Sequence, residues 1–141
     1  MTENEKIILE FIKKHTLATI ATVDSSDSPQ AAVLEFSETD NLELIFDTFS
    51  TYRKYINIQN NPKVALVIGW DNDITVQYEG IAFELKGDEI KKYQNIHVAK
   101  LPKAKKFVDM DVVRYFKVTP KWIRYSDLSV NPWNVFEVNY P

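Results

Sequence analysis

The chain has 141 residues, of which 45% are hydrophobic, 13% are aromatic and none is cysteine. This composition indicates one globular domain over residues 1–141, and it excludes a disulfide framework, a thiol nucleophile and a cysteine-based metal site. The net charge of -3 argues against a general nucleic-acid binder, and no apolar run is long enough to cross a membrane. The acidic N-terminus lacks the layout of a signal peptide, so we expect a cytoplasmic protein without a nucleic-acid or membrane partner.

The N-terminal third predicts one helix followed by a meander of strands. Thr2 and Glu5 have the spacing of a capping box, and apolar residues follow at helical spacing, which predicts a helix over residues 3–14. The period then changes to that of extended chain, interrupted by two short turn-forming clusters. We expect three antiparallel strands, over residues 17–23, 30–37 and 42–48.

The middle of the chain predicts a short helix between strands. Ser50 or Thr51 can cap a helix within residues 49–62, where Asn60, Asn61 and Pro62 stop it. Strands follow over residues 63–70 and 74–87. The apolar positions of the second strand change parity at Gly80, which predicts a β-bulge that returns both sets to one face.

The C-terminal third predicts helix and then strands. Residues 88–109 are lysine-rich and helical, with an interruption at Pro102, and residues 112–127 have the pattern of a hairpin with a short extended piece after it. Consecutive strands joined by short turns favour a mainly β protein, an antiparallel barrel with a few flanking helices, over a doubly wound parallel sheet.

The segment with the clearest chemical content surrounds the short central helix. If Thr51 caps that helix, Arg53 and Lys54 lie in its first turn, where the helix dipole disfavours positive charge. A bound anion would explain them, since free N–H groups, hydroxyls and two cations together form a phosphate cradle. Two solvated charges on a surface helix remain the alternative.

Other polar residues have simpler explanations. His15 ends a helix and is expected to cap it, whereas His97 is expected to be solvated, with a haem-ligand role as an alternative. Two distant histidines without cysteine do not make a zinc site, so we expect no metal. Asp24 and Asp27 are expected to form a turn. The lysines of the second helical region are expected to form a solvated face, with phosphate or nucleic-acid contact as the alternative; these are Lys100, Lys103, Lys105 and Lys106.

The run LIFDTFSTYRKYINIQNNPKVALVIG resembles the flavin-phosphate region of the pyridoxamine 5'-phosphate oxidase-like, FMN-binding split β-barrels. The matching residues are Phe46, Thr48, Thr51, Arg53, Lys54, Asn61, Pro62, Val64, Ala65 and Leu66. The strand TVQYEGIAFEL, with Gln77, and the segment KWIRY, with Trp122 and Arg124, match further patterns of that family. The resemblance covers residues 5–127, and its strength lies in the ordered set of motifs.

The resemblance implies a homodimer with two FMN sites between the subunits. Thr51, Arg53 and Lys54 would hold the phosphate. The isoalloxazine ring would lie, largely on backbone groups, against Val33, Leu34, Phe46, Asp47 and Thr48. Gln77, Trp122 and Arg124 would reach the flavin from the partner subunit.

Three functions are compatible with this resemblance. The first is a flavin-dependent oxidoreductase, in which the cofactor carries the redox chemistry and no catalytic side chain is required. The second is a non-catalytic carrier of flavin or deazaflavin, and the third is a haem-handling protein of the same fold. Family members that oxidise pyridoxamine phosphate are longer and carry an Arg-x-His motif that this sequence lacks, so we expect a different substrate.

Overall fold

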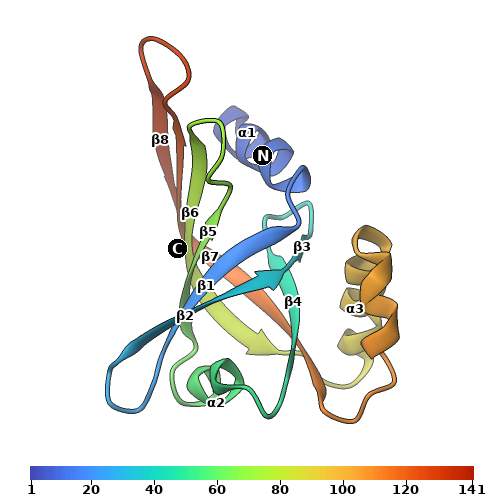
Figure 1. Ribbon diagram of the computed structural model, residues 1–141. Coiled ribbons are helices and arrows are strands. Elements are labelled where there is room, and N and C mark those ends of the chain that lie inside the picture. The colour runs from blue at the N-terminus through green and yellow to red at the C-terminus, as the bar shows by residue number, and fades with distance from the viewer.

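The computed structural model describes residues 1–141 and shows a strongly curled sheet with three α-helices around it (Figure 1). The sequence forms strands where β-branched and aromatic residues alternate and helices where the apolar period lengthens. In chain order the elements are α1 (Glu3–Lys13), β1 (Leu17–Val23), β2 (Pro29–Glu35), β3 (Ser37–Glu38), β4 (Leu44–Phe49), α2 (Arg53–Asn60), β5 (Lys63–Ile68), β6 (Ile74–Glu84), α3 (Asp88–Lys100), the 3-10 helix η1 (Pro102–Phe107), β7 (Val113–Asp127) and β8 (Asn134–Asn139).

The sheet is antiparallel throughout and does not close. Its strand order is β2-β1-β5-β6-β7-β4-β3, and β8 pairs with β7. β2 pairs only with β1, and β3 pairs only with Leu44 and Ile45 of β4. The remainder of β4 and the outer side of β2 are therefore free edges, and the curvature of the sheet brings them toward each other (Figure 1). This is the expected antiparallel split barrel.

The predicted N-terminal helix and the turn at Asp24 are confirmed, but the predicted meander is wrong, because β4 pairs with β7 and β3 and not with β2. The Glu5 N–H donates to Thr2 Oγ1 at 3.2 Å, and the Thr2 N–H donates to Glu5 Oε2 at 2.8 Å, which completes the capping box of α1. Asp24 forms its turn by accepting hydrogen bonds from the N–H groups of Ser26 and Ser28. Local signals of this kind are readable from sequence because their partners lie only two to four residues apart.

The irregularity near Gly80 is present, but its consequence differs from the prediction. The register of β6 and β7 shifts between Glu79 and Gly80, and Lys121 of β7 is the extra residue, since Glu79 pairs with Trp122 and Gly80 with Pro120. The bulge thus lies on β7, where a proline can sit without a ladder N–H. A Cβ on Gly80 would lie 2.5 Å from the Thr119 carbonyl oxygen, so this close approach requires glycine.

The prediction that the apolar residues before and after Gly80 share one face of β6 is wrong, because β6 keeps one alternation along its length. Val76, Tyr78 and Ala82 point inward, whereas Ile81 is half-buried and Phe83 is exposed on the other face. A bulge in the neighbouring strand shifts the register of the pair without rotating β6 itself.

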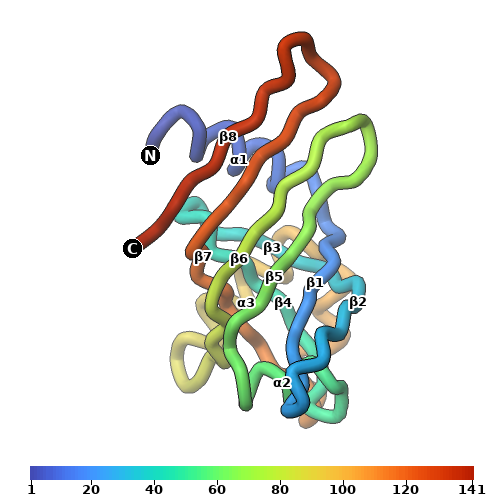
Figure 2. Tube along the Cα trace, turned by 90° about the vertical axis from the view of Figure 1, so that its left-hand side faces the viewer, coloured from blue at the N-terminus to red at the C-terminus, as the bar shows by residue number.

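The predicted hairpin over residues 112–127 is also wrong. β7 is one continuous strand, and the hairpin at this end joins β7 to β8, which extends beyond the rest of the sheet (Figure 2). Proline is common in turns, which is why Pro120 predicted one, but here it lies opposite Gly80 of β6 and the strand continues through it. The expected extended piece at the C-terminus is confirmed as β8.

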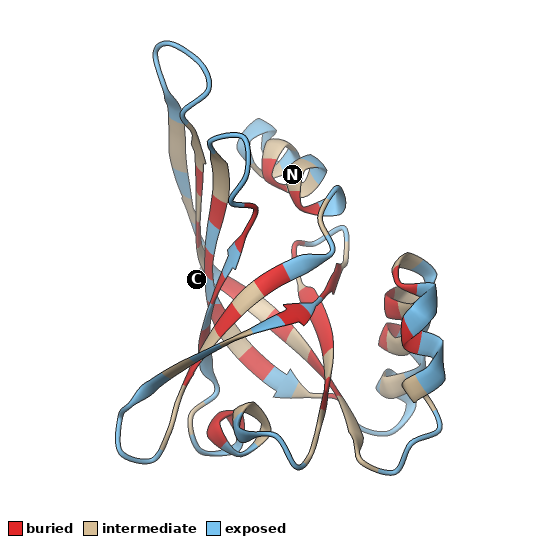
Figure 3. Cartoon of the chain, viewed as in Figure 1, coloured by how far each residue is buried: buried red, intermediate tan, exposed pale blue.

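The main core fills the inside of the curled sheet, and Figure 3 shows buried residues alternating along its strands. Its largest fully buried side chains include Phe36, Phe46, Tyr78 and Phe116, and the Phe46 and Phe116 rings stack with centroids 5.2 Å apart. A smaller cluster of Ile45, Leu85, Tyr93 and Tyr115 joins α3 to the outer side of β4 and β7. None of the helices combines the length and the apolar character needed to cross a membrane.

Candidate functional site

The start of α2 lies beside the open side of the barrel and lacks a side-chain cap. Tyr52, with φ -85° and ψ 150°, is the N-cap residue, so the predicted cap by Ser50 or Thr51 is wrong. The Ser50 N–H donates to the Val112 carbonyl at 2.8 Å, which continues the β4–β7 ladder and keeps Ser50 out of the capping position. The first turn of α2 consequently offers N–H groups that no side chain of the chain accepts.

One buried side chain fixes α2 against the sheet. The Asn57 amide donates to Thr22 Oγ1 of β1 at 3.0 Å and to Gln30 Oε1 of β2 at 2.9 Å. These bonds hold the beginning of the helix over the inner side of β1 and β2. Sequence reasoning missed Asn57, although a polar residue between apolar positions of a short helix is a usable signal for a buried hydrogen bond.

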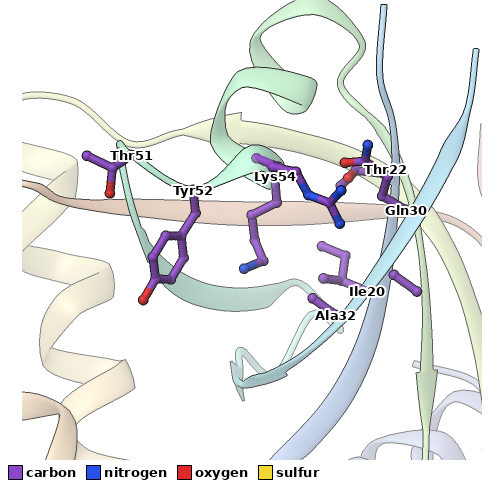
Figure 4. Close-up of a pocket in the computed structure, with 9 residues that line it drawn as sticks. Ile20, Thr22, Gln30, Ala32, Thr51, Tyr52 and Lys54 are labelled. Atoms are coloured by element: carbon purple, nitrogen blue, oxygen red, sulfur yellow. The ribbon is translucent and has the colours of Figure 1, made fainter. Parts of the chain in front are cut away.

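A cavity of 320 Å³ opens at this helix start, which we name the α2 cavity (Figure 4). Figure 4 shows the Lys54 side chain descending between Tyr52 and the strand residues Ile20 and Ala32. Neither Arg53 nor Lys54 has a carboxylate within 4.0 Å, and burial lowers the pKa of Lys54. The residues that line the α2 cavity are Ile20, Thr22, Gln30, Ala31, Ala32, Thr51, Tyr52, Arg53 and Lys54.

A second cavity of 300 Å³, which we name the His97 cavity, adjoins the first and shares Tyr52 and Lys54 with it. It lies between the free edges of β2 and β4, with η1 along its rim. Its walls combine apolar surface with carboxylates, an imidazole and three lysines. The lining residues are Val33, Leu34, Glu35, Asp47, Thr48, Phe49, Tyr52, Lys54, His97, Lys103, Ala104, Lys106 and Phe107.

The expectation that His97 is solvated is wrong, because the residue is 0% exposed. It shares the inner face of α3 with Ile90, Tyr93 and Leu101, which follow one another at spacings of three and four residues. That spacing is visible in the sequence and could have identified His97 as a buried residue. Lys100 is likewise not fully solvated, since it pairs with Glu38 and lies over the Phe36 ring.

Three buried polar atoms at the His97 cavity have no hydrogen-bond partner: Asp47 Oδ2, Thr48 Oγ1 and His97 Nε2. Burial, together with the nearby charge of Glu35, raises the pKa of Asp47 to about 6. Burial, together with the charge of Lys100, lowers the pKa of His97 to about 4. Unpartnered buried polar atoms are rare in folded proteins, and at a cavity wall they indicate a place for a ligand.

The structure brings most of the predicted site residues together and separates others. The two adjoining cavities are lined by Val33, Leu34, Asp47, Thr48, Thr51, Arg53 and Lys54. Phe46 is 0% exposed and stacks in the core, so only its backbone can face a ligand. Gln77, Trp122 and Arg124 line neither cavity and lie on the outward face of β6 and β7. Their predicted contact with a cofactor bound in the partner subunit stays a prediction.

The paired cavities fit a phosphorylated flavin in their chemistry. One end offers two unpaired cations and an uncapped helix start, which suit a phosphate dianion. The other end offers apolar walls and aromatic rings with unpartnered donors and acceptors, which suit a flat ring edged with heteroatoms.

The fold and this arrangement define an antiparallel split barrel with two unpaired cations and an uncapped helix start at its open side. The sequence profile of the pyridoxamine 5'-phosphate oxidase family matches residues 5–127. The chain belongs to that family. A pyridoxine/pyridoxamine 5'-phosphate oxidase of Shewanella pealeana is 34% identical over 83 residues, which cover 58% of this chain and 39% of that protein. The match thus spans well under half the length of this relative.

Solved structures share the fold at low sequence identity. A haem-binding protein from Mycobacterium smegmatis superposes with a TM-score of 0.84 at 14% identity, over 99% of this chain and 59% of that one. A pyridoxamine 5'-phosphate oxidase-related, FMN-binding protein from Nostoc punctiforme gives 0.77 at 14% identity, over 100% and 93%. Because these identities are low, the likeness establishes the fold alone.

Proposed function

We propose that the protein is an FMN-binding flavoprotein and a flavin-dependent oxidoreductase. The observation that carries this proposal is the α2 cavity, where Arg53 and Lys54 have no carboxylate partner beside a helix start without a side-chain cap. A phosphate dianion supplies the charge that this arrangement lacks. Family membership and the FMN-binding relative of the same fold support the choice of ligand.

In this proposal each cavity holds one part of the cofactor. Thr51, Arg53 and Lys54 bind the phosphate, and the walls formed by β2 and β4 exclude water from the ring. When bound, FMN supplies the transfer of electrons or hydride to and from a substrate, and the protein contributes binding and orientation.

The test is a paired titration of FMN and riboflavin into the parent and into the double variant Arg53→Ala, Lys54→Ala. Charge-assisted hydrogen bonds contribute about 1.5–3 kcal/mol each, so losing one weakens FMN binding by about tenfold to a few hundredfold. Riboflavin lacks the phosphate and should bind weakly to both. The double variant Lys91→Ala, Lys92→Ala is the matched control, because it removes the same charge from exposed positions of α3 outside both cavities.

The titration tests where the phosphate binds, and two further measurements distinguish the candidate functions. Unchanged FMN affinity in the Arg53, Lys54 variant would place the phosphate elsewhere, and equal loss for both ligands would mean that these residues support the ring. A Soret band on haem addition, without flavin binding, would favour the haem-handling function instead. Bleaching of bound flavin by a substrate distinguishes an oxidoreductase from a carrier.

We propose further that a second copy of this chain covers the outward face of the sheet. Strand register places one row of side chains across six strands on this face: Val33, Thr19, Val67, Gln77, Arg124 and Glu137. The next row includes three alanines, Ala31, Ala21 and Ala65, followed by Glu79 and Trp122. Val33 is 61% exposed, so the apolar part of these rows, on β2, β1 and β5, suits packing against another protein surface.

A homodimer through this face would bring Gln77, Trp122 and Arg124 of one subunit to the partner. Obligate interfaces bury on the order of 2,000 Å² or more, so the dimer should persist at micromolar concentration. Val67→Arg should dissociate it in light scattering, whereas Val130→Arg, in the exposed loop between β7 and β8, should not. A folded monomer of the parent protein would contradict the proposal.

A further inference from the structure

A line of three polar side chains runs from the buried side of β3 to the His97 cavity. Ser37 Oγ lies 2.7 Å from His97 Nδ1, and His97 Nε2 lies 3.7 Å from Asp47 Oδ2. Ser37 and His97 are 0% exposed, and the side chain of Asp47 is 19% exposed. Asp47 is therefore the end of the line that reaches the cavity.

The two facing atoms, His97 Nε2 and Asp47 Oδ2, have no hydrogen-bond partner. Two acceptors facing each other in a buried place repel, so one of these atoms carries a proton. When the carboxyl is ionised, Nε2 carries the hydrogen and the Ser37 hydroxyl donates to Nδ1. When the carboxyl is protonated, Nε2 accepts, and Nδ1 donates to the same hydroxyl, which serves both states because it can donate and accept.

Burial reverses the ordinary order in which these groups take up protons. The pKa of Asp47 is raised from 3.8 to about 6, and the pKa of His97 is lowered from 6.5 to about 4. Desolvation causes both shifts because it disfavours the charged form of each group. On acidification from neutral pH, the first proton thus goes to the carboxyl group, while the imidazole stays neutral.

We propose that Asp47 exchanges a proton with the ligand held in the His97 cavity, and that His97, oriented by Ser37, is its positioning residue. The inference rests on the proposed function for the identity of that ligand. In the exchange, the O–H bond of the carboxyl group breaks as the proton bonds to a basic nitrogen or oxygen of the ligand. His97 then changes tautomer by exchange with solvent: its Nδ1–H bond breaks, an Nε2–H bond forms, and the Ser37 hydroxyl turns from acceptor to donor. The Nε2–H faces the remaining carboxylate, no atom changes oxidation state, and solvent returns the proton to Asp47.

Several other charges act on Asp47. Glu35 of β2 favours its protonated form, and a hydrogen bond from the backbone N–H of Asp47 itself favours its ionised form. Three lysines line the same cavity: Lys54 of α2 and Lys103 and Lys106 of η1. Tyr115 of β7 pairs with Asp47 across the ladder. A single pH profile would mix these contributions, so the tests compare variants.

The first test titrates the protein without ligand by NMR, following the carboxyl carbon of Asp47 and the ring nitrogens of His97. We expect Asp47 to titrate near pH 6 while His97 stays neutral. His97→Leu should raise the Asp47 midpoint by about one unit, because the facing N–H is lost, and His97→Gln should restore most of it. Glu35→Gln should lower the midpoint. An Asp47 midpoint near its ordinary value of about 4, or one unmoved by His97→Leu, would overturn the inference.

The second test measures proton uptake when FMN binds, by calorimetry at pH 7 in buffers of different ionisation enthalpy. Further burial by the ligand should protonate Asp47, so the parent should take up about half a proton more than Asp47→Asn. The FMN phosphate also titrates near pH 6, but both proteins keep the cradle, so its contribution cancels in the difference. His97→Leu serves as a second comparison should Asp47→Asn fail to fold.

The outcomes distinguish this inference from the proposed function. If FMN does not bind to the parent, the proposed function fails, and the titration without ligand decides the state of Asp47. If FMN binds and the parent and Asp47→Asn take up the same number of protons, the proton-exchange role alone is refuted.

Discussion

The interior of the barrel and the wall of its open side differ in whether their buried polar atoms have hydrogen-bond partners. Inside, the Tyr78 hydroxyl lies 2.8 Å from the Leu42 carbonyl oxygen and 3.0 Å from the Val118 carbonyl oxygen, so its single hydrogen has two acceptors within reach. At the wall, Asp47, Thr48 and His97 each bury an atom without a partner. Inside the barrel the chain itself supplies the acceptors, whereas at the wall three polar atoms have no partner within the chain.

The topology explains why the difference arises at this place. The strands β1, β5, β6 and β7 each have paired neighbours on both sides. The wall lies where β2 and β4 turn free edges toward each other, so side chains there face a gap between elements instead of a packed neighbour. A site at the split of an open barrel needs no insertion or extra domain.

The largest expected effect comes from the interior. Phe46→Ala removes a fully buried ring from its stack on Phe116 and should lower the free energy of unfolding by about 3–5 kcal/mol. Val130→Ala, in an exposed loop, should change it by less than about 0.5 kcal/mol. Denaturant unfolding at one protein concentration measures both. A small effect of Phe46→Ala would mean that the core is not packed as described.

The second prediction concerns the pH dependence of stability at the wall. Between pH 4 and 6 the unfolded chain protonates His97 and the folded chain does not, so acidification lowers stability through this residue. Over the same range the folded chain protonates Asp47 and the unfolded chain does not, so acidification raises stability through that residue. The two contributions oppose each other in the parent.

Removing either partner should expose the contribution of the other. Relative to the parent, Asp47→Asn should lose about 1.4 kcal/mol of unfolding free energy per unit of acidification between pH 6 and 4, and His97→Leu should gain about the same. The measurement is denaturant unfolding at several pH values. Parallel pH profiles for all three proteins would show that the pair does not hold its protons as inferred.

Sequence reasoning succeeded where signals are local. The capping box of α1 and the cations at the start of α2 follow from residues close together in the chain, and the family resemblance supplied the split-barrel arrangement. It failed where a partner decides the structure. Pro120 has the local signature of a turn, and only its place opposite Gly80 of β6 lets β7 continue.

The contact between Asp47 and His97 could not be predicted from the sequence, because it also depends on partners that are distant in the chain. Asp47 and His97 are 50 residues apart in the chain, and only the packing of α3 against β3 and β4 brings them together. The lysines around His97 suggested a solvated helix, whereas the spacing of Ile90, Tyr93 and Leu101 marks the buried face to which His97 belongs. Charge composition describes the outer face of such a helix and says little about the inner one.

The third prediction tests the completeness of the interior. Tyr78→Phe removes a buried hydroxyl whose hydrogen has the Leu42 and Val118 carbonyl oxygens as acceptors, and it should lower the free energy of unfolding by about 1–3 kcal/mol. Tyr125→Phe is a suitable control, because Tyr125 belongs to the same core and its hydroxyl makes no hydrogen bond within the protein. Equal stability of Tyr78→Phe and the parent would remove the contrast between interior and wall.

The smallest expected effect on stability comes from Thr48→Val at the wall. The same substitution at Thr22, whose hydroxyl has a buried partner, gives the comparison. Thr48→Val removes an unpartnered hydroxyl with little change in shape, so without ligand the free energy of unfolding should stay within about 0.5 kcal/mol of the parent. Thr22→Val removes the acceptor of a buried Asn57 hydrogen bond and should cost about 1–3 kcal/mol. If FMN completes the wall, Thr48→Val should also weaken FMN binding by about tenfold, a loss of about 1.4 kcal/mol. Unfolding and FMN titration of both variants measure these effects. A Thr48→Val protein that loses stability as Thr22→Val does would show that Thr48 is already satisfied within the protein, and the wall would then need no ligand at this position.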